Sequence, residues 1–240
     1  MLTGLTDAFL NLVYPQNCRI CSECVEQSAD GIACKACWSD TRILSKIHVL
    51  CKKCGAFLRE SEQPVETLCR QCDDHLYDSA RAVGVYENAL AATVVQLKHT
   101  PHIPRTLIRF LHDTLEQTAF GDATLIVPVP LSAKRLKERG FNQAEVIAKV
   151  IAGKKRIPLD SYSLARRLHT PMHRVAMDKK AREMTVRKAF EVKRPNLVAG
   201  HNILLIDDVF TSGSTVSYCA KALKKSGAAK VNVLTLARAV

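Results

Sequence analysis

The chain has 240 residues, of which 47% are hydrophobic and 24% charged, so one sizeable core with a smaller appended module is expected rather than a disordered chain. Its net charge of +12 and pI near 9.3 favour polyanionic partners, such as nucleic acid, phosphorylated ligands or an acidic membrane face. No apolar run reaches the roughly eighteen residues of a membrane span, and no signal peptide is recognised. We therefore expect a cytoplasmic protein.

Nine of the ten cysteines lie before residue 73, and eight of them form four Cys-x-x-Cys pairs. The pairs are Cys18/Cys21, Cys34/Cys37, Cys51/Cys54 and Cys69/Cys72. Two intervening residues allow a tight turn that places both thiolates on one tetrahedral ion, and a cytosolic chain should not hold this many disulfides. The pattern predicts two structural zinc ions; one zinc ion, redox pairs or disulfides are the alternatives.

Sequential pairing is the simplest assignment of these ligands, although the spacing does not exclude crossed pairing. The first zinc site would then comprise Cys18, Cys21, Cys34 and Cys37, and the second Cys51, Cys54, Cys69 and Cys72. Cys24 is left over as a spare thiol or alternative ligand, whereas Cys219 lies in an apolar helical pattern typical of a core residue. Sites made only of cysteine are closed, which indicates a scaffold rather than catalysis.

Strand and helix patterns alternate after about residue 77. Strands are expected at 80–88, 123–130, 161–168, 203–208 and 230–238, and helices at 90–99, 103–117, 141–152 and 214–227. This alternation predicts an α/β fold with a parallel sheet covered on both faces. The composition change predicts a zinc module over residues 1–76 and an α/β domain over residues 77–240.

Two acids, Asp207 and Asp208, follow the apolar run 203–206, and a loop of small hydroxyl residues comes next. We call residues 211–215 the hydroxyl loop; it consists of Thr211, Ser212, Gly213, Ser214 and Thr215. Ligands bind at the carboxyl ends of parallel strands, and a helix that follows such a loop attracts anions. A sugar phosphate would satisfy both features, because its phosphate fits the loop and its hydroxyls can donate to the carboxylates. Simple helix capping is the alternative.

The segment LLIDDVFTSGST resembles the phosphoribosyl pyrophosphate (PRPP) motif of type I phosphoribosyltransferases. Residues 127–145, VPVPLSAKRLKERGFNQAE, are similar to the signature of the ComF family of ComFC- and GntX-like proteins. Residues 96–99 and 170–190 match other segments of that family more loosely, and the cysteine pairs resemble its double zinc ribbon. The resemblance covers nearly the whole chain. It implies a type I phosphoribosyltransferase-like domain, with magnesium accompanying PRPP.

The resemblance also implies roles for individual residues. It makes Asp207 and Asp208 the candidate catalytic residues, and it places PRPP on these two acids, on the hydroxyl loop, and on Arg135 and Arg139. Residues 134–194 hold 18 Lys and Arg against 6 Asp and Glu, which suits single-stranded nucleic acid. The candidate nucleic-acid-binding residues in this segment are Lys134, Arg135, Arg139, Arg182 and Arg187. A solvated basic helix face is the alternative interpretation.

Three functions remain open at this stage. ComF membership implies a PRPP-binding protein that acts in natural transformation on incoming single-stranded DNA. A phosphoribosyltransferase of nucleotide salvage is the first alternative, although no aromatic base-binding segment is evident after residue 238. A zinc-ribbon adaptor for DNA-processing proteins is the second.

Overall fold

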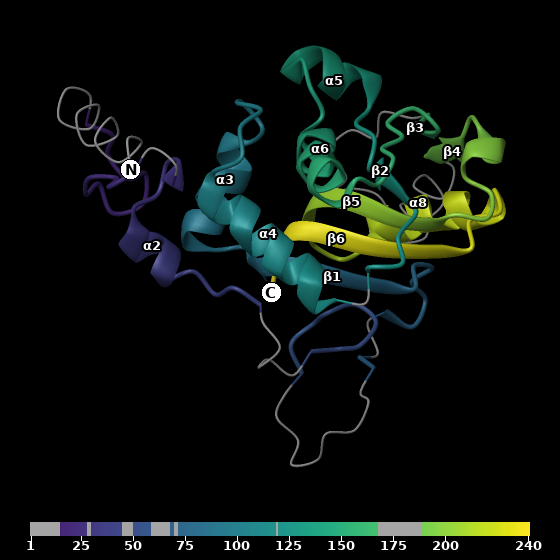
Figure 1. Cartoon of the computed structure of the whole chain (residues 1–240), viewed down its shortest axis with the longest axis horizontal. Coiled ribbons are helices and arrows are strands. Elements are labelled where there is room, and N and C mark those ends of the chain that lie inside the picture. Colours follow the sequence, from purple (N-terminus) through teal and green to yellow (C-terminus); the bar gives the residue numbers. More distant parts are fainter. Residues whose placement is uncertain are drawn as a thin grey trace, which may run out of the picture.

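The computed structural model describes residues 15–27, 30–44, 50–58, 68–69, 72–118, 120–167 and 189–240. Four parallel strands form the main sheet in the order β1, β6, β5, β2 (Figure 1). Their bounds are β1 Ser79–Val85, β2 Leu125–Pro128, β5 Asn202–Phe210 and β6 Lys230–Arg238. The predicted parallel α/β architecture is confirmed.

Helices cover both faces of this sheet. Helices α3 (Asn88–Gln96), α4 (Arg105–Gln117) and α6 (Gln143–Lys155) contribute to the core cluster on one face, and α8 (Ser214–Lys225) contributes to the cluster on the other. The smaller elements are α2 (Lys35–Ser39), α5 (Ala133–Arg139), β3 (Leu164–Arg166), β4 (Phe190–Val192) and the 3-10 helix η3 (Pro195–Leu197). None of the helices in the part of the chain that the structure describes is long and apolar enough to cross a membrane.

The alternation of side chains along β5 explains why the sheet needs two helical layers. Ile203 and Leu205 pack in the core cluster that contains the α8 residues, whereas Leu204 and Ile206 pack in the cluster of α3, α4 and α6. All four side chains are at most 1% exposed. A parallel strand buried on both faces reads as a continuous apolar run, which is what residues 203–206 show.

Three local expectations need correction. Strand β5 continues two residues beyond its expected end, to Phe210, and Asp207 pairs with Thr235 of β6. A helix was expected only after Gly140, but residues 133–139 form the separate helix α5. Gly140, with a φ of +79°, ends α5 before α6 begins. Strand β3 pairs antiparallel with β4, outside the main sheet, because residues 190–192 supply an unexpected partner.

The zinc module is built onto both faces of the sheet and onto its edge. Cys18, Cys34 and Cys37 join the core cluster of α3 and α4, whereas Cys51, Cys54 and Cys72 join that of α8. Between the two sites, the chain covers the edge strand β1. Leu44 N–H donates to Val83 O at 2.8 Å, and Ala80 N–H donates to Lys53 O at 2.6 Å. These bonds pair backbone groups that an edge strand would otherwise expose.

Candidate functional site

The candidate site lies at the carboxyl end of β5, where two acids leave the core. Asp207 and Asp208 are both half-buried. The Asp207 carboxylate accepts a hydrogen bond from the backbone N–H of Asp208 at 2.9 Å. The Asp208 carboxylate accepts from Val209 N–H at 2.8 Å and from the Gln143 amide at 3.1 Å. Each carboxylate is therefore oriented by neighbouring donors before any ligand is present.

The electrostatics of this pair favour a ligand that donates hydrogen bonds or carries positive charge. Burial raises the pKa of Asp207 well above its usual range, and the charge of Asp208 adds to this effect, while the Arg166 guanidinium opposes it. A ribose hydroxyl or a cation would relieve the repulsion between the carboxylates. Arg166 belongs to β3, so the small second sheet contributes a charge to the site.

The hydroxyl loop joins β5 to α8 and presents its polar groups outward. Thr211, Ser212, Ser214 and Thr215 are exposed, while Gly213 is buried. The N-cap residue of α8 is Gly213, which has no side chain to cap the helix. Ser212 Oγ accepts a long hydrogen bond from Ser214 N–H at 3.4 Å, and the Ser212 and Ser214 hydroxyls lie 2.9 Å apart. The N–H groups of this turn and the positive end of the helix dipole suit a phosphate. The hydroxyl loop and the first turn of α8 therefore remain the candidate anion site.

Gly213 has a structural role beyond ligand approach. Its φ is +74°, and a Cβ at this position would lie 2.6 Å from Phe210 Cζ and 2.8 Å from His75 Cε1. The space above its Cα is therefore filled by two side chains of the protein. Only glycine combines this backbone conformation with such close packing.

The basic residues after β2 form the second part of the candidate site. Arg135 and Arg139 lie half-buried on α5, and the hydroxyl of Ser132 caps this helix. Lys134 is exposed and lies 4.0 Å from Glu138, which is a solvent-facing pair. Arg182 and Arg187 lie outside the described residues. The two arginines predicted to bind PRPP are thus partly covered by the protein, whereas Lys134 is exposed to solvent.

Gln143 lies at the site but is not among the candidate residues predicted from the sequence. It is 6% exposed, and its Nε2 donates to Asp208 while its Oε1 is buried without a hydrogen-bond partner among the described residues. Arg139 Nη1 is likewise buried without a hydrogen-bond partner among the described residues. An unsatisfied buried polar atom costs about 1–3 kcal/mol, so both atoms are candidates to meet a ligand. The signal was the sequence RGFNQ at 139–143, which lies within the segment similar to the ComF signature and places Gln143 at the first position of α6.

Both predicted zinc sites are assembled in the sequential pairing. Within each set of four cysteines, the sulfur atoms lie within 4.8 Å of one another. The Cys18–Cys37 and Cys51–Cys72 sulfur pairs are each 3.7 Å apart. Four sulfurs at 2.3 Å from a tetrahedral zinc ion would be separated by about 3.8 Å. All ten cysteines are free thiols, so the disulfide alternative is wrong for this structure.

The thiols of the second set differ in their electrostatics: burial and neighbouring cysteines raise the pKa of Cys54 and Cys72, whereas Cys51 is shifted the other way. Burial raises the pKa of Cys51, but N–H donors from Cys54, Cys69 and Lys53 outweigh it and lower the pKa to about 6. Such donors stabilise the thiolate that a metal requires. Cys24 lies outside both sets, and its thiol donates weakly to Val25 O at 3.7 Å. Cys219 is fully buried in the α8 core, as predicted.

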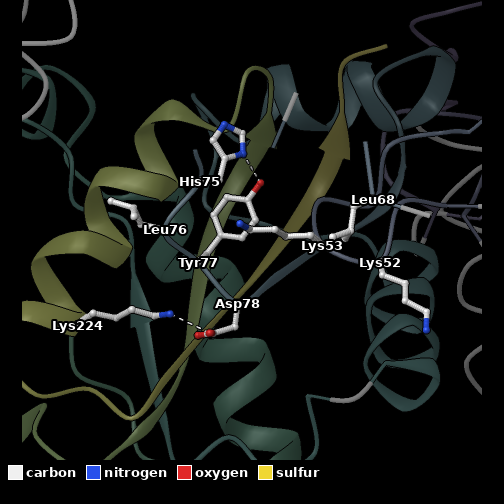
Figure 2. A pocket seen from close by; sticks show the side chains of 8 residues that line it. All are labelled: Lys52, Lys53, Leu68, His75, Leu76, Tyr77, Asp78 and Lys224. Atoms are coloured by element: carbon white, nitrogen blue, oxygen red, sulfur yellow. Dashed lines mark hydrogen bonds and ion pairs between the residues drawn. The ribbon is translucent and has the colours of Figure 1, made fainter. Parts of the chain in front are cut away.

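A cleft of about 530 Å³ is lined by His75, Tyr77 and Asp78 (Figure 2), and neither Asp207 nor Asp208 is among its lining residues. The rest of the lining comes from residues beside the ligands of the second zinc site and from α8; these residues are Lys52, Lys53, Leu68, Leu76 and Lys224. At one end Lys224 pairs with Asp78 at 2.8 Å, and Asp78 also accepts from Val231 N–H at 2.7 Å. These contacts tie α8 to the start of β1 and β6, so the cleft marks the joint between the second zinc site and the sheet.

Two family models match the chain. The double zinc ribbon domain matches residues 9–73, and the phosphoribosyl transferase domain matches residues 94–239. Among solved structures, a glutamine PRPP amidotransferase from B. subtilis complexed with ADP and GMP is 19% identical with a TM-score of 0.36. That match covers 70% of this chain and 31% of the amidotransferase chain, so the chain spans about a third of that enzyme's length.

Three curated relatives have functional names. "Competence protein ComFC" of Bacillus subtilis is 30% identical over 222 residues, which cover 85% of this chain and 84% of the relative. "DNA utilization protein YhgH" of Salmonella typhimurium is 30% identical over 236 residues, covering 95% and 99%. "Competence protein F" of Haemophilus influenzae is 29% identical over 196 residues, covering 79% and 84%.

Proposed function

The chain belongs to the ComF family and joins a double zinc ribbon to a phosphoribosyl transferase domain, and from this premise we propose that it is a PRPP-binding protein of DNA uptake. One observation carries the PRPP assignment: the paired acids Asp207 and Asp208 lie directly before an exposed hydroxyl loop at the start of α8. The names of the relatives and the net charge of +12 support the role in DNA handling.

The sugar phosphate end of PRPP suits this part of the site. Its 5′-phosphate accepts from the hydroxyls of the hydroxyl loop and from the N–H groups of the first turn of α8. Its ribose hydroxyls donate to the carboxylates of Asp207 and Asp208. Gln143 holds the Asp208 carboxylate in place through the 3.1 Å hydrogen bond. The acids that would repel a bare phosphate thereby select a phosphate that carries a sugar diol.

The pyrophosphate end is assigned to α5. Arg135 and Arg139 can donate to phosphate oxygens, and a guanidinium does so through two parallel hydrogen bonds. Magnesium bound with PRPP would supply charge that offsets the pyrophosphate, with the carboxylates of Asp207 and Asp208 as the available oxygen ligands. Lys134, which is exposed, and the basic segment up to residue 194 are assigned to the phosphates of single-stranded DNA.

A second candidate is catalytic transfer of ribose 5-phosphate from PRPP to a nitrogen acceptor, and the paired acids favour it. The bond from the anomeric carbon to pyrophosphate breaks with its electron pair leaving on the pyrophosphate oxygen. A carbon–nitrogen bond forms, and the acceptor loses a proton. Negative charge on Asp207 and Asp208 would stabilise the positive charge that develops on the sugar.

Calorimetric titration tests the PRPP assignment. We expect magnesium–PRPP to bind the zinc-loaded chain and to lose its affinity in the Asp207→Asn/Asp208→Asn variant. Ribose 5-phosphate is the matched ligand, because it keeps the loop and diol contacts and lacks the pyrophosphate. Failure of the zinc-loaded wild type to bind PRPP would contradict the proposal. Release of pyrophosphate with an added base or single strand would establish the catalytic candidate.

The DNA assignment has its own test. We expect binding of a single-stranded oligonucleotide to weaken as salt rises, because Lys and Arg release counterions from the phosphates. Lys134→Ala should lower the slope of log affinity against log salt by about one. Lys230→Ala is the matched control, since Lys230 pairs with Asp122 at 3.0 Å on β6, outside the basic segment. An affinity independent of salt would rule out phosphate contacts.

A further inference from the structure

Arg238 connects the second zinc site to the end of β5. It is the last residue of β6 and only 7% exposed. Its Nη1 donates to the carbonyl oxygen of Cys54 at 2.7 Å, and its Nη2 lies 3.9 Å from the Cys54 sulfur. The guanidinium carbon lies 4.6 Å from the centre of the Phe210 ring. A nearly buried charge requires such partners, so this contact is tightly specified.

His75 makes a second connection from the same zinc site. Its backbone N–H donates to the carbonyl oxygen of Cys72 at 3.0 Å. Its ring Nδ1 lies 2.6 Å from the Tyr77 hydroxyl (Figure 2). The Tyr77 ring meets Phe210 edge-on, with centroids 6.1 Å apart. The adjacent Leu76 N–H donates to Ser217 Oγ in α8 at 3.0 Å. Residues that follow Cys72 therefore contact both the aromatic pair and α8.

These two connections converge on Gly213, at the centre of the hydroxyl loop. Phe210 and His75 fill the space where a Gly213 Cβ would lie, at 2.6 and 2.8 Å. The Phe210 ring contacts Arg238, which donates to Cys54 O, and the backbone of His75 donates to Cys72 O. The two side chains that pack against Gly213 are thus each connected to a ligand residue of the second zinc site, one through Arg238 and the other through its own backbone.

We propose that the second zinc site positions the hydroxyl loop for phosphate binding, with Arg238 and His75 as the positioning residues. An anion site made of N–H groups and hydroxyls works only when these donors already point to one place. Zinc fixes Cys54 and Cys72, and the two side chains transmit that order to Phe210 and Gly213. The affinity for PRPP then depends on the second zinc ion. This inference rests on the proposed PRPP binding.

The experiment combines hydrogen exchange with PRPP titration on the zinc-loaded full chain. The variants are Arg238→Gln, Arg238→Lys and His75→Ala. The matched control is Arg19→Gln, because Arg19 also joins a zinc knuckle to the α/β domain, through a 2.9 Å hydrogen bond to Gln96 of α3. Zinc content is measured for every variant, and exchange of α6 amides reports global stability.

We expect Arg238→Gln and His75→Ala to raise the exchange rate of amides 211–217 about tenfold and to weaken PRPP binding by a similar factor. The α6 amides should exchange as in the wild type, and two zinc ions should remain bound. Arg238→Lys should recover part of the effect because it keeps a charged donor. Arg19→Gln should change neither measurement.

The two proposals fail in different ways. Unchanged exchange of amides 211–217 in both Arg238→Gln and His75→Ala overturns the positioning role, even when PRPP binds. Faster exchange of these amides without any PRPP binding to the wild type supports the positioning role and overturns the proposed ligand. If Arg238→Gln destabilises the whole fold, His75→Ala decides the question, because His75 is only half-buried.

Discussion

The two zinc sites have the same ligands and similar sulfur geometry, but they attach to different parts of the molecule. The first packs through Trp38 against Phe110 of α4, with ring centroids 6.0 Å apart, and through Arg19 against α3. The second contacts β1, the end of β6 and the residues next to the hydroxyl loop. Identical metal chemistry can therefore serve one site as a pure scaffold and the other as a support for a ligand site.

Removing the ligands of each site separately gives the largest expected contrast. We expect Cys34→Ser/Cys37→Ser and Cys51→Ser/Cys54→Ser each to lose one zinc ion, because each variant removes two of the four thiolate ligands of its site. The second-site variant should lose about 100-fold in PRPP affinity, and the first-site variant should keep its affinity. Zinc content, far-UV circular dichroism and calorimetry check this. Equal losses of affinity in both variants would remove the distinction.

Trp38 tests the scaffold role of the first site more gently. The side chain is 4% exposed, and its indole N–H donates to Asp30 O at 3.0 Å. We expect Trp38→Ala to lower the free energy of unfolding by about 3–5 kcal/mol through the cavity it leaves. PRPP affinity should stay unchanged below the new melting temperature. Denaturant unfolding and calorimetry measure the two effects, and a parallel fall in affinity would link the first site to the ligand.

Asp207 should show the smallest effect, and one that depends on pH. Its pKa is raised by burial and by Asp208, so the folded chain takes up a proton more readily than the unfolded chain. The charged carboxylate therefore destabilises the fold increasingly as pH rises above the unfolded value of about 3.9. Asp207→Asn should raise the melting temperature at pH 7 by a few degrees, as about 1 kcal/mol does in a chain of this size.

The control for this prediction is the same pair of proteins at lower pH. The advantage of Asp207→Asn should shrink as the pH falls from 7 toward the unfolded value of about 3.9, because the raised pKa makes stability fall with rising pH above that value. An advantage that stays constant with pH would contradict the raised pKa. The variant should also bind PRPP less well, which would place this acid among residues kept for function at a cost in stability.

The sequence by itself determined the zinc ligands and the class of the fold. The spacing of four Cys-x-x-Cys pairs predicts zinc ligands, and the apolar run 203–206 predicts that β5 is buried on both faces. The two acids and the hydroxyl loop were equally readable, because a strand, a turn and a helix start are local in the chain. These features need no knowledge of distant contacts.

Only the tertiary structure decided which part of the α/β domain each zinc site contacts. Arg238 contacts Cys54 across 184 positions of sequence, and Leu76 contacts Ser217 across 141. No local sequence pattern predicts such contacts, because they depend on how the two core clusters form on opposite faces of the sheet. The strand partner β4 and the antiparallel β3–β4 pair were missed for the same reason. The spacing of the cysteines in the sequence specifies the zinc ligands, but the packing of the folded chain determines which part of the α/β domain each zinc site contacts.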